Sequence, residues 1–226
     1  MAIAMQLPIS GDDSAAHGHS LIPGWVQLPW RAERRAQSLP HVGENRSMAT
    51  TSSASSRLLK GFPPVSAKDA RVLILGSMPG AASLQAHQYY AHRHNRFWPI
   101  MGELVGAAPA LPYAQRLLRL QQCGIALWDV FDRCEREGSL DSAIRDDTAQ
   151  ANDFIAFFEG HRGIRTVLFN GAKAESGFRR LAGVQPDALG LQCVRLPSTS
   201  PANASISPAV KLAAWREALR AGGILA

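Results

Sequence analysis

Residues 71–80 read RVLILGSMPG, a short run of branched apolar side chains that stops at glycine, serine and proline. A run of this length and composition is typical of a strand buried on both faces, as in a parallel sheet. Gly76, Pro79 and Gly80 then interrupt regular structure. Open α/β sheets bind ligands at the carboxyl ends of their strands, so a binding site is expected directly after Leu75.

Four apolar runs of this kind alternate with helical patterns along the chain. They span residues 71–76, 124–129, 165–170 and 191–196. This alternation predicts the α/β class, as a three-layer α/β/α sandwich with a central four-stranded, mainly parallel sheet. The expected helices include 97–104, one around 154–158, and a last helix with Ser207 as N-cap, Pro208 at its first position and Gly222 and Gly223 at its end.

The chain divides into an N-terminal extension and one folded domain. Residues 1–56 are rich in Ser, Ala, Pro and His without a sustained period, which predicts a disordered extension; residues 57–226 form the domain. Lys and Arg number 24 against 18 Asp and Glu, and residues 1–50 hold four of each sign, so the net charge of +6 belongs to the remainder. A basic domain suits a polyanionic partner.

Composition also bears on cofactors and location. Cys123, Cys134 and Cys193 are too few and too scattered for a disulfide framework or a four-thiolate zinc or iron–sulfur site. His87, His92 and His94 share one loop, but their spacing matches no strong zinc pattern. With no secretory signal and no apolar run of membrane-spanning length, we expect a cytoplasmic protein without metal or other cofactor.

Seven segments, in the expected order, resemble the uracil-DNA glycosylase superfamily, and above all its hypoxanthine-DNA (deoxyinosine) glycosylase branch. They are GSMPG at 76–80, QYY at 88–90, NRFW at 95–98, LWDV at 127–130, CEREGSLDSAI at 134–144, FNG at 169–171 and LPSTSPAN at 196–203. The resemblance implies that residues 57–226 form a catalytic domain of this type. It implies a monofunctional glycosylase of base excision repair, which hydrolyses the N-glycosidic bond of deoxyinosine and releases hypoxanthine.

The resemblance also implies that Asn95 is the catalytic residue. A neutral amide is not a strong base, so Asn95 would orient a water molecule against the anomeric carbon while the sugar develops positive charge. Asn95 also directly precedes the 97–104 helix and would serve as its N-cap, and the two roles are compatible. Ser77 stands where other branches place Asp, Asn or Glu, which argues against a carboxylate-activated water at that position.

The base-binding residues implied by the resemblance include Tyr90 as a wall of the pocket and Asn170 as the reader of the base edge. The full set is Gly76, Ser77, Met78, Tyr90, Phe97 and Asn170. Simpler interpretations stay open: Gly76 and Gly80 would serve backbone conformations with positive φ, and Asn170 would be a turn residue before Gly171. We expect Trp98 in the core, Asp129 to fix a loop, and residues 134–137 at the solvated surface.

The segment after the fourth strand resembles the superfamily's second motif, which contacts DNA beside the flipped nucleotide. Its candidate DNA-binding residues are Pro197, Ser198, Thr199, Ser200, Pro201 and Asn203. Small hydroxyls and backbone N–H groups approach phosphates closely, although a plain Ser/Pro loop is the alternative. Many sister branches begin this loop with a histidine that supports the departing base. Leu196 and Pro197 stand there instead, so that support is expected from hydroxyl or N–H groups.

Three other functions remain open from the sequence. One is a broader glycosylase that also removes uracil or xanthine, and another is a non-catalytic DNA-binding module of the same fold. A nucleotide-binding protein is disfavoured because residues 76–80 lack the Gly-Lys-Ser/Thr ending of a P-loop.

The pocket motifs hold no lysine to form a Schiff base, so strand cleavage is not expected. We expect a monomer that binds damaged DNA with the deaminated base flipped out, and no membrane partner.

Overall fold

The computed structural model describes residues 58–226. The disordered extension expected over residues 1–56 lies outside the described residues and stays a prediction. The three cysteines all lie within the described part, and all are free thiols. None of the helices in this part of the chain is both long and apolar enough to cross a membrane.

Four parallel strands form the central sheet, in the order β3-β2-β6-β7. They are β2 (Val72–Gly76), β3 (Ile125–Asp129), β6 (Thr166–Asn170) and β7 (Gln192–Leu196). Each begins one residue later than its predicted run and ends at the same residue. Val72 pairs with both Ile125 and Thr166, and Thr166 pairs with Gln192. The four strands are therefore in register, and their carboxyl ends lie at the same edge of the sheet.

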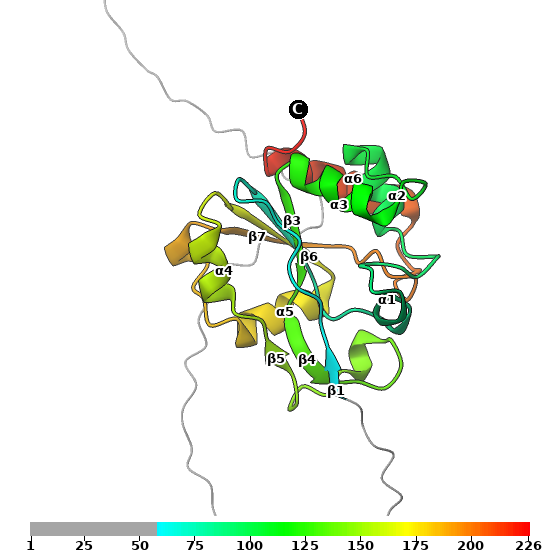
Figure 1. The fold of residues 1–226 in the computed structure, drawn as a ribbon, viewed down its shortest axis with the longest axis vertical. Coiled ribbons are helices and arrows are strands. Elements are labelled where there is room, and N and C mark those ends of the chain that lie inside the picture. The colour runs from blue at the N-terminus through cyan, green and yellow to red at the C-terminus, as the bar shows by residue number, and fades with distance from the viewer. Residues whose placement is uncertain (1–57) are drawn as a thin grey trace, which may run out of the picture.

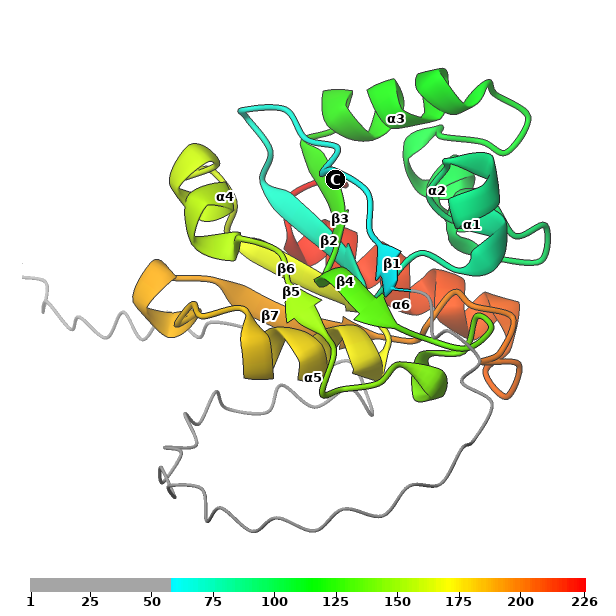
Figure 2. The same cartoon turned by 60° about the horizontal axis from the view of Figure 1, so that its bottom comes forward.

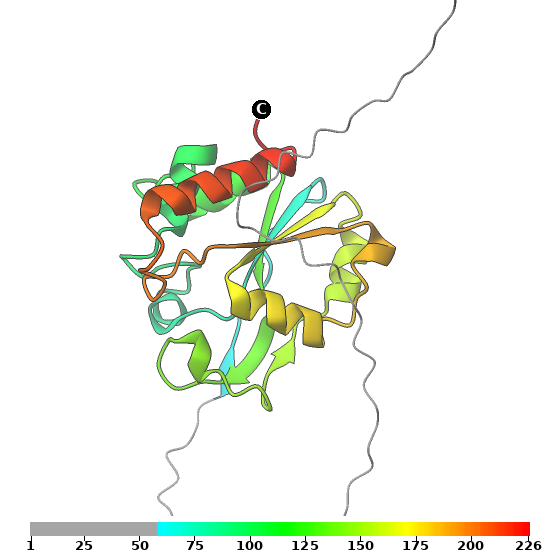
Figure 3. The same ribbon diagram turned by 180° about the vertical axis from the view of Figure 1, so that it is seen from behind.

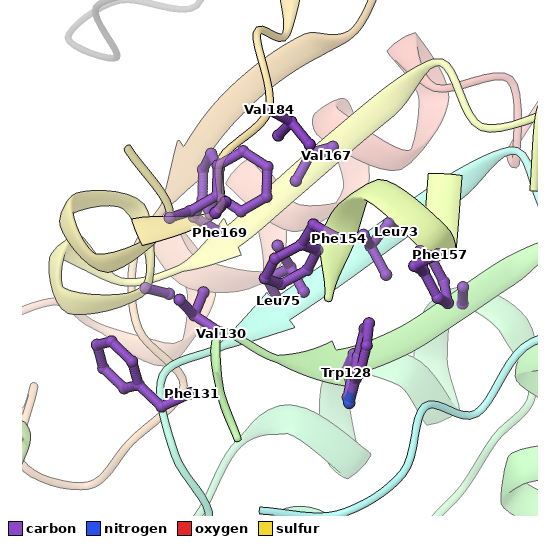
Figure 4. Close-up of a cluster of buried hydrophobic side chains, with 14 of the residues drawn as sticks. Leu73, Leu75, Trp128, Val130, Phe131, Phe154, Phe157, Val167, Phe169 and Val184 are labelled. Carbon is purple, nitrogen blue, oxygen red and sulfur yellow. The ribbon is translucent and has the colours of Figure 1, made fainter. Parts of the chain in front are cut away.

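One face of the sheet is covered by two helices that contribute a cluster of phenylalanines. These are α4 (Phe154–Gly160) and α5 (Ala172–Leu181). Leu73 and Leu75 of β2 point toward Phe154 (Figure 4). Trp128 of β3 packs on Phe154 and Phe157, with ring centroids 5.2 Å and 5.0 Å apart. These residues are buried, and they anchor α4 against the sheet.

The alternate side chains of the same strands face a second helical layer. It consists of α2 (Phe97–Val105), α3 (Tyr113–Gln122) and α6 (Pro208–Ala221), grouped on one side of the sheet in Figure 1. Val72 and Ile74 pack into one cluster with Phe97 of α2 and Trp215 of α6. Figure 3 shows α5 and α6 on opposite sides of the strands. The predicted three-layer α/β/α sandwich is confirmed, with a sheet that is parallel throughout.

The helix signals in the sequence are confirmed at several ends. Ser207 Oγ accepts a hydrogen bond from the Val210 N–H at 3.3 Å, Pro208 is the first residue of α6, and Gly222 follows its last residue. Helix α2 begins at Phe97, as predicted, and ends one residue later than predicted. Trp98 is buried in the core, as expected.

A second, antiparallel sheet was not predicted from the sequence. It has the order β1-β4-β5, from β1 (Leu58–Lys60), β4 (Phe131–Glu135) and β5 (Gln150–Ala151). Figure 2 shows these three strands beside one another, in front of the main sheet. Cys134 and Arg136 are buried, so the expectation of a solvated surface at residues 134–137 is wrong for these two positions. The chain then turns through the 3-10 helices η1 (Asp141–Ala143) and, later, η2 (Asp187–Leu189).

Candidate active site

A cavity of about 640 Å³ opens at the carboxyl ends of the four parallel strands. The loop after β7 and helix α1 (Ala81–Ala86) lie side by side at this edge in Figures 1 and 3. Ligand pockets commonly measure roughly 300–1,000 Å³, so the cavity has room for a planar ring and part of an attached sugar. Its lining includes most of the predicted site residues, namely Gly76, Ser77, Met78, Tyr90, Asn95, Asn170, Ser198, Ser200, Pro201 and Asn203.

Gly76, Tyr90 and Asp129 meet at what we call the floor of the cavity. A Cβ added to Gly76 would overlap Asp129 Oδ1 and lie 3.0 Å from Tyr90 Oη. Neither Gly76 nor Gly80 has a positive φ. The interpretation of these glycines as sites of left-handed backbone is therefore wrong; Gly76 is required by the close approach of two polar side chains.

Tyr90 forms a wall of the cavity and is held there by an unusual backbone conformation. Its φ is +55°, a value that non-glycine residues adopt rarely and that tends to mark functional sites. The ring stacks on Phe97 with centroids 4.0 Å apart. Phe97 is completely buried and does not line the cavity. The predicted contact of Phe97 with a base is therefore corrected: Phe97 supports the Tyr90 ring from behind.

The Tyr90 hydroxyl is buried without a hydrogen-bond partner. Asn170 lies close to it without forming a hydrogen bond. Burial, followed by the neighbouring Asp129 carboxyl, raises the pKa of Tyr90. The phenol therefore keeps its proton and stays available as a hydrogen-bond donor.

Asn95 combines the two roles considered from the sequence. Its Oδ1 accepts a hydrogen bond of 2.9 Å from the Phe97 N–H at the start of α2. The side chain also lines the cavity. An amide has two donor protons and two acceptor positions, so this single bond fixes the orientation of Asn95 and leaves the remaining capacity for a ligand or a water molecule.

Another part of the cavity lining comes from residues 139–142. Their segment is hydrogen-bonded to the residues that follow β2. Arg136 is only 7% exposed and donates hydrogen bonds to the carbonyls of Met78 (3.4 Å), Pro79 (2.5 Å) and Gly138 (3.2 Å). The Ser77 hydroxyl donates to Asp141 Oδ1 at 2.6 Å. Asp141 therefore reaches the cavity beside Ser77, although the two residues are far apart in the sequence.

Asp129 is a buried carboxyl of the cavity whose pKa is strongly raised. It is 3% exposed, lines the cavity, and its Oδ2 has no hydrogen-bond partner. Burial, and then the negative charge of Asp141, raises the pKa of the Asp129 carboxyl to about 7, against a smaller opposing effect of Arg136. We expected Asp129 to fix a loop, and its backbone carbonyl does accept a hydrogen bond from Asn152 Nδ2 at 2.8 Å. This structural role does not explain why the side-chain carboxyl is buried in the cavity.

This shift predicts how stability depends on pH. The pKa of the Asp129 carboxyl is near 4 in the unfolded chain and about 7 in the folded protein. Between these values the folded state keeps a proton that the unfolded state has lost, so the contribution of Asp129 to the free energy of unfolding falls as pH rises through this range. At about 1.4 kcal/mol per pKa unit, the loss is at most about 4 kcal/mol.

We expect Asp129→Asn to gain stability over the wild type as pH rises from about 4.5 to about 8, measured by denaturant unfolding. The comparison is a difference between variants, which removes the pH dependence that both proteins share. Asp69→Asn alters an exposed carboxyl that precedes the other end of β2 and is expected to follow the wild-type profile. A stability difference that stays constant with pH would contradict the prediction.

The Asn170 side chain ties β6 to the loop after β7. Its Nδ2 donates to Thr199 Oγ1 at 2.9 Å, and its Oδ1 accepts from the Thr199 N–H at 2.8 Å. One N–H of the amide therefore remains for a ligand. Thr199 is fully buried and Pro197 is buried, and neither lines the cavity. Their expected direct contact with DNA is corrected to a supporting role beneath Ser198, Ser200 and Asn203.

The sequence interpretation missed Asp141 and undervalued Asp129. Asp129 ends the second predicted strand, so the rule that ligands bind at carboxyl ends was a usable signal for it. Asp141 carried no such signal, because Arg136 and Ser139 bring its segment to the cavity. His92 lines the cavity as well. Within residues 58–226, no three His, Cys, Asp or Glu side chains come together as a metal site.

Comparison with known proteins agrees with this architecture. Residues 63–219 match the sequence profile of the Uracil DNA glycosylase superfamily. A protein of Methanosarcina acetivorans named hypoxanthine DNA glycosylase is 38% identical over 149 residues, which cover 66% of this chain and 90% of the relative. One of Methanosarcina barkeri with the same name is 40% identical over 116 residues, covering 51% of this chain and 72% of the relative.

A solved structure gives the same result. The solution NMR structure of a Methanosarcina acetivorans protein, described as a candidate uracil DNA glycosylase, has a TM-score of 0.59 and 34% identity. The match covers 71% of this chain and 98% of that protein. A profile match over most of the chain, similar sequences and the same fold agree, and the chain belongs to the uracil DNA glycosylase superfamily.

Proposed function

We propose that this chain is a monofunctional DNA glycosylase that hydrolyses the N-glycosidic bond of deoxyinosine in DNA and releases hypoxanthine. The relatives named hypoxanthine DNA glycosylase support this substrate. The observation that carries the proposal is that Tyr90, Asn95 and the Ser77–Asp141 pair face one cavity at the carboxyl ends of the strands. An aromatic wall beside fixed polar groups suits a planar base with a polar edge.

The mechanism begins with extrusion of the nucleotide from the duplex into the cavity, because the glycosidic bond is inaccessible within the stack. The Tyr90 ring, supported by Phe97, offers a surface on which the base can stack. Asn95 is held by the Phe97 N–H and would orient water toward the anomeric carbon. As the bond breaks, the sugar becomes positively charged, and correctly placed dipoles stabilise that transition state.

The product is expected to be an abasic site in an unbroken strand. No lysine is among the residues that line the cavity in the described part of the chain, so no amine is placed to attack the sugar. Lys211 is buried behind the loop after β7, where its Nζ donates to the Asn203 carbonyl at 2.8 Å. This lysine supports the loop and does not line the cavity.

DNA contact is assigned to the loop after β7 and to nearby basic side chains. Ser198, Ser200 and Asn203 line the cavity mouth, and the exposed Arg93 and Arg96 flank Asn95 in sequence. Hydroxyls and backbone N–H groups contact phosphates closely, while guanidinium groups displace bound cations from the DNA backbone.

We further propose that the protein acts as a monomer in the cytoplasm.

The decisive experiment is release of free base from oligonucleotides that each contain one inosine, uracil or xanthine. Release of hypoxanthine ahead of the other bases is expected, with an abasic, uncut strand as product. Comparable release of all three bases would favour the broader deaminated-base glycosylase. Retarded gel mobility without release of any base would indicate a DNA-binding module and contradict the proposal.

A second experiment separates base reading from phosphate contact. Asn170→Ala removes the free N–H that we assign to the base edge, so the ratio of inosine to uracil excision is expected to change on the order of tenfold. Replacing Ser198 and Ser200 by alanine is expected to weaken binding to all substrates alike, because phosphate contacts carry no sequence information.

The matched control for Asn170 is Thr199→Val. It removes the hydroxyl that accepts from Asn170 Nδ2 and loosens the loop, but it leaves Asn170 in place. This variant is expected to slow excision of every base to a similar extent. If Asn170→Ala also slows all substrates equally, Asn170 supports the loop and does not read the base.

A further inference from the structure

Two buried polar atoms at the floor of the cavity have no hydrogen-bond partner: Tyr90 Oη and Asp129 Oδ2. A buried polar group left unpaired costs free energy, and nearly all such groups in folded proteins find a partner. Both residues line the cavity. The missing partner can therefore come from a molecule that enters the cavity.

The charges around Asp129 favour its neutral form. Arg136 is the cation that lowers the pKa of Asp129, but its guanidinium is occupied by the carbonyls of Met78, Pro79 and Gly138. No ion pair of Asp129 occurs among residues 58–226. The groups that face it electrostatically are Asp141 from η1, Arg136 after β4, Tyr89 and Tyr90 before α2, and Tyr113 of α3.

Burial beside another carboxylate, without a paired cation, favours the protonated form of a carboxyl. With a pKa of about 7, a large fraction of Asp129 is protonated near neutral pH. In that form Asp129 is a hydrogen-bond donor as well as an acceptor. A purine offers this donor several acceptors, since hypoxanthine carries O6, N3 and N7 on its edges. A neutral acid is the form that can assist a departing base, and pairs of carboxyls with different environments commonly divide such roles.

We propose that Asp129 is a further catalytic residue, which contacts the flipped base as a neutral carboxylic acid and supplies the proton or hydrogen bond that helps the base depart. This inference rests on the proposed glycosylase function. It answers a question raised by the sequence, because the loop after β7 lacks the histidine that supports the leaving base in sister branches. In this protein the hydrogen-bond donor for the leaving base would instead be Asp129, at the end of β3 on the floor of the cavity.

The step balances in atoms and electrons. The bond between N9 of hypoxanthine and C1′ of the sugar breaks, and its electron pair stays with the base. Asp129 transfers its proton to the base, which leaves neutral. Water adds through its oxygen to C1′ and loses one proton to solvent, and the Asp129 carboxylate takes one proton back from solvent. The net reaction consumes one water and yields free base and an abasic sugar.

The test is single-turnover release of hypoxanthine from a deoxyinosine duplex by the full chain, between about pH 6 and pH 9. The wild-type rate is expected to fall about tenfold per pH unit above the titration of Asp129, because only its protonated form donates. Asp129→Asn keeps an N–H donor of the same shape but does not titrate, so its rate is expected to be lower at pH 6 and level above it. Asp129→Ala is expected to lose activity on the order of 10² at pH 6.

A second variant moves the titration without changing Asp129. Asp141→Asn removes the neighbouring negative charge, so the fall in rate is expected to shift to lower pH. Asp69→Asn, which alters an exposed carboxyl, is expected to keep the wild-type profile. Ionisation of the substrate affects all variants equally and cancels in the comparison. Melting temperatures and DNA mobility shifts establish that each variant is folded and binds.

The outcomes separate this inference from the proposed function. Identical pH profiles for the wild type and Asp129→Asn, or a fall in rate that does not move in Asp141→Asn, would overturn the role of Asp129 and leave the deoxyinosine activity in place. A wild-type chain that releases no base at any pH would overturn the proposed function itself, and the role of Asp129 with it.

Discussion

Replacing Asn95 by alanine is expected to slow single-turnover excision of hypoxanthine by a factor on the order of 10² or more. The physical reason is the fixed orientation of the amide: its Oδ1 is held by the Phe97 N–H at 2.9 Å, and its remaining capacity faces the cavity. Loss of an interaction made in the transition state lowers the rate without weakening the ground-state complex. DNA affinity should therefore stay within a few fold of the wild type.

The same substitution also removes a hydrogen bond at the start of α2, so about 1 kcal/mol of stability should be lost. Asp153→Ala is the matched control, because Asp153 Oδ1 accepts from the Ala156 N–H at the start of α4, away from the cavity lining. It should show a similar loss in chemical denaturation and an unchanged excision rate. If Asn95→Ala behaves like this control, Asn95 is only a helix cap.

The parallel sheet could be predicted because its strands carry a simple signal. Residues of β2, β3 and β6 are buried along their whole length, so their sequences read as continuous apolar runs between turn residues. The antiparallel sheet carries no such signal. Strand β1 has three residues and β5 has two, while β4 reads FDRCE. Its pairing of Leu59 with Cys134 joins distant parts of the chain, which local patterns do not reveal.

Topology and motif resemblance each predicted a part of the site, and the resemblance correctly brought Tyr90 and Asn95 to the cavity. The rule that parallel strands end at a common edge correctly brings Gly76, Asn170 and Ser198 to one cavity. Motif resemblance did not distinguish a side chain in the wall from one behind it. Phe97 and Thr199 are fully buried because Tyr90 and Asn170 lie over them or bind them, and such packing depends on the whole fold.

Asp141 shows a different reason for a missed residue. Its segment follows β4 and has neither helical period nor strand alternation. It reaches the cavity because Arg136 binds the carbonyls after β2 and because the Ser139 hydroxyl accepts from the Ala81 N–H at 3.0 Å. A buried arginine in a mixed-charge run is the exception to the usual exposure of such runs. The family resemblance includes residues 134–144, but only the contacts show that Asp141 lies in the site.

Gly76→Ala is expected to be the most damaging single-methyl change in the GSMPG motif at residues 76–80. The added Cβ would overlap Asp129 Oδ1 and approach Tyr90 Oη to 3.0 Å, and both side chains are confined at the floor of the cavity. Forcing them apart should cost roughly 1–3 kcal/mol of stability, as overpacking of a close-packed interior does. Because the same shift displaces the stacking ring and the floor carboxyl, excision should fall by on the order of 10² even where the variant is fully folded.

Gly80→Ala provides the matched control for this prediction, four residues along the same motif. Its φ of −68° is open to any residue, and an added Cβ would meet Ser139 at an ordinary distance of 3.8 Å. Unfolding free energy and excision rate should therefore stay near the wild type, measured by denaturant titration and single-turnover release. Equal losses in the two variants would mean that the motif needs glycine for its backbone. A loss confined to Gly76→Ala would locate the requirement in the close approach of Asp129 and Tyr90 to Gly76, where the base is proposed to leave.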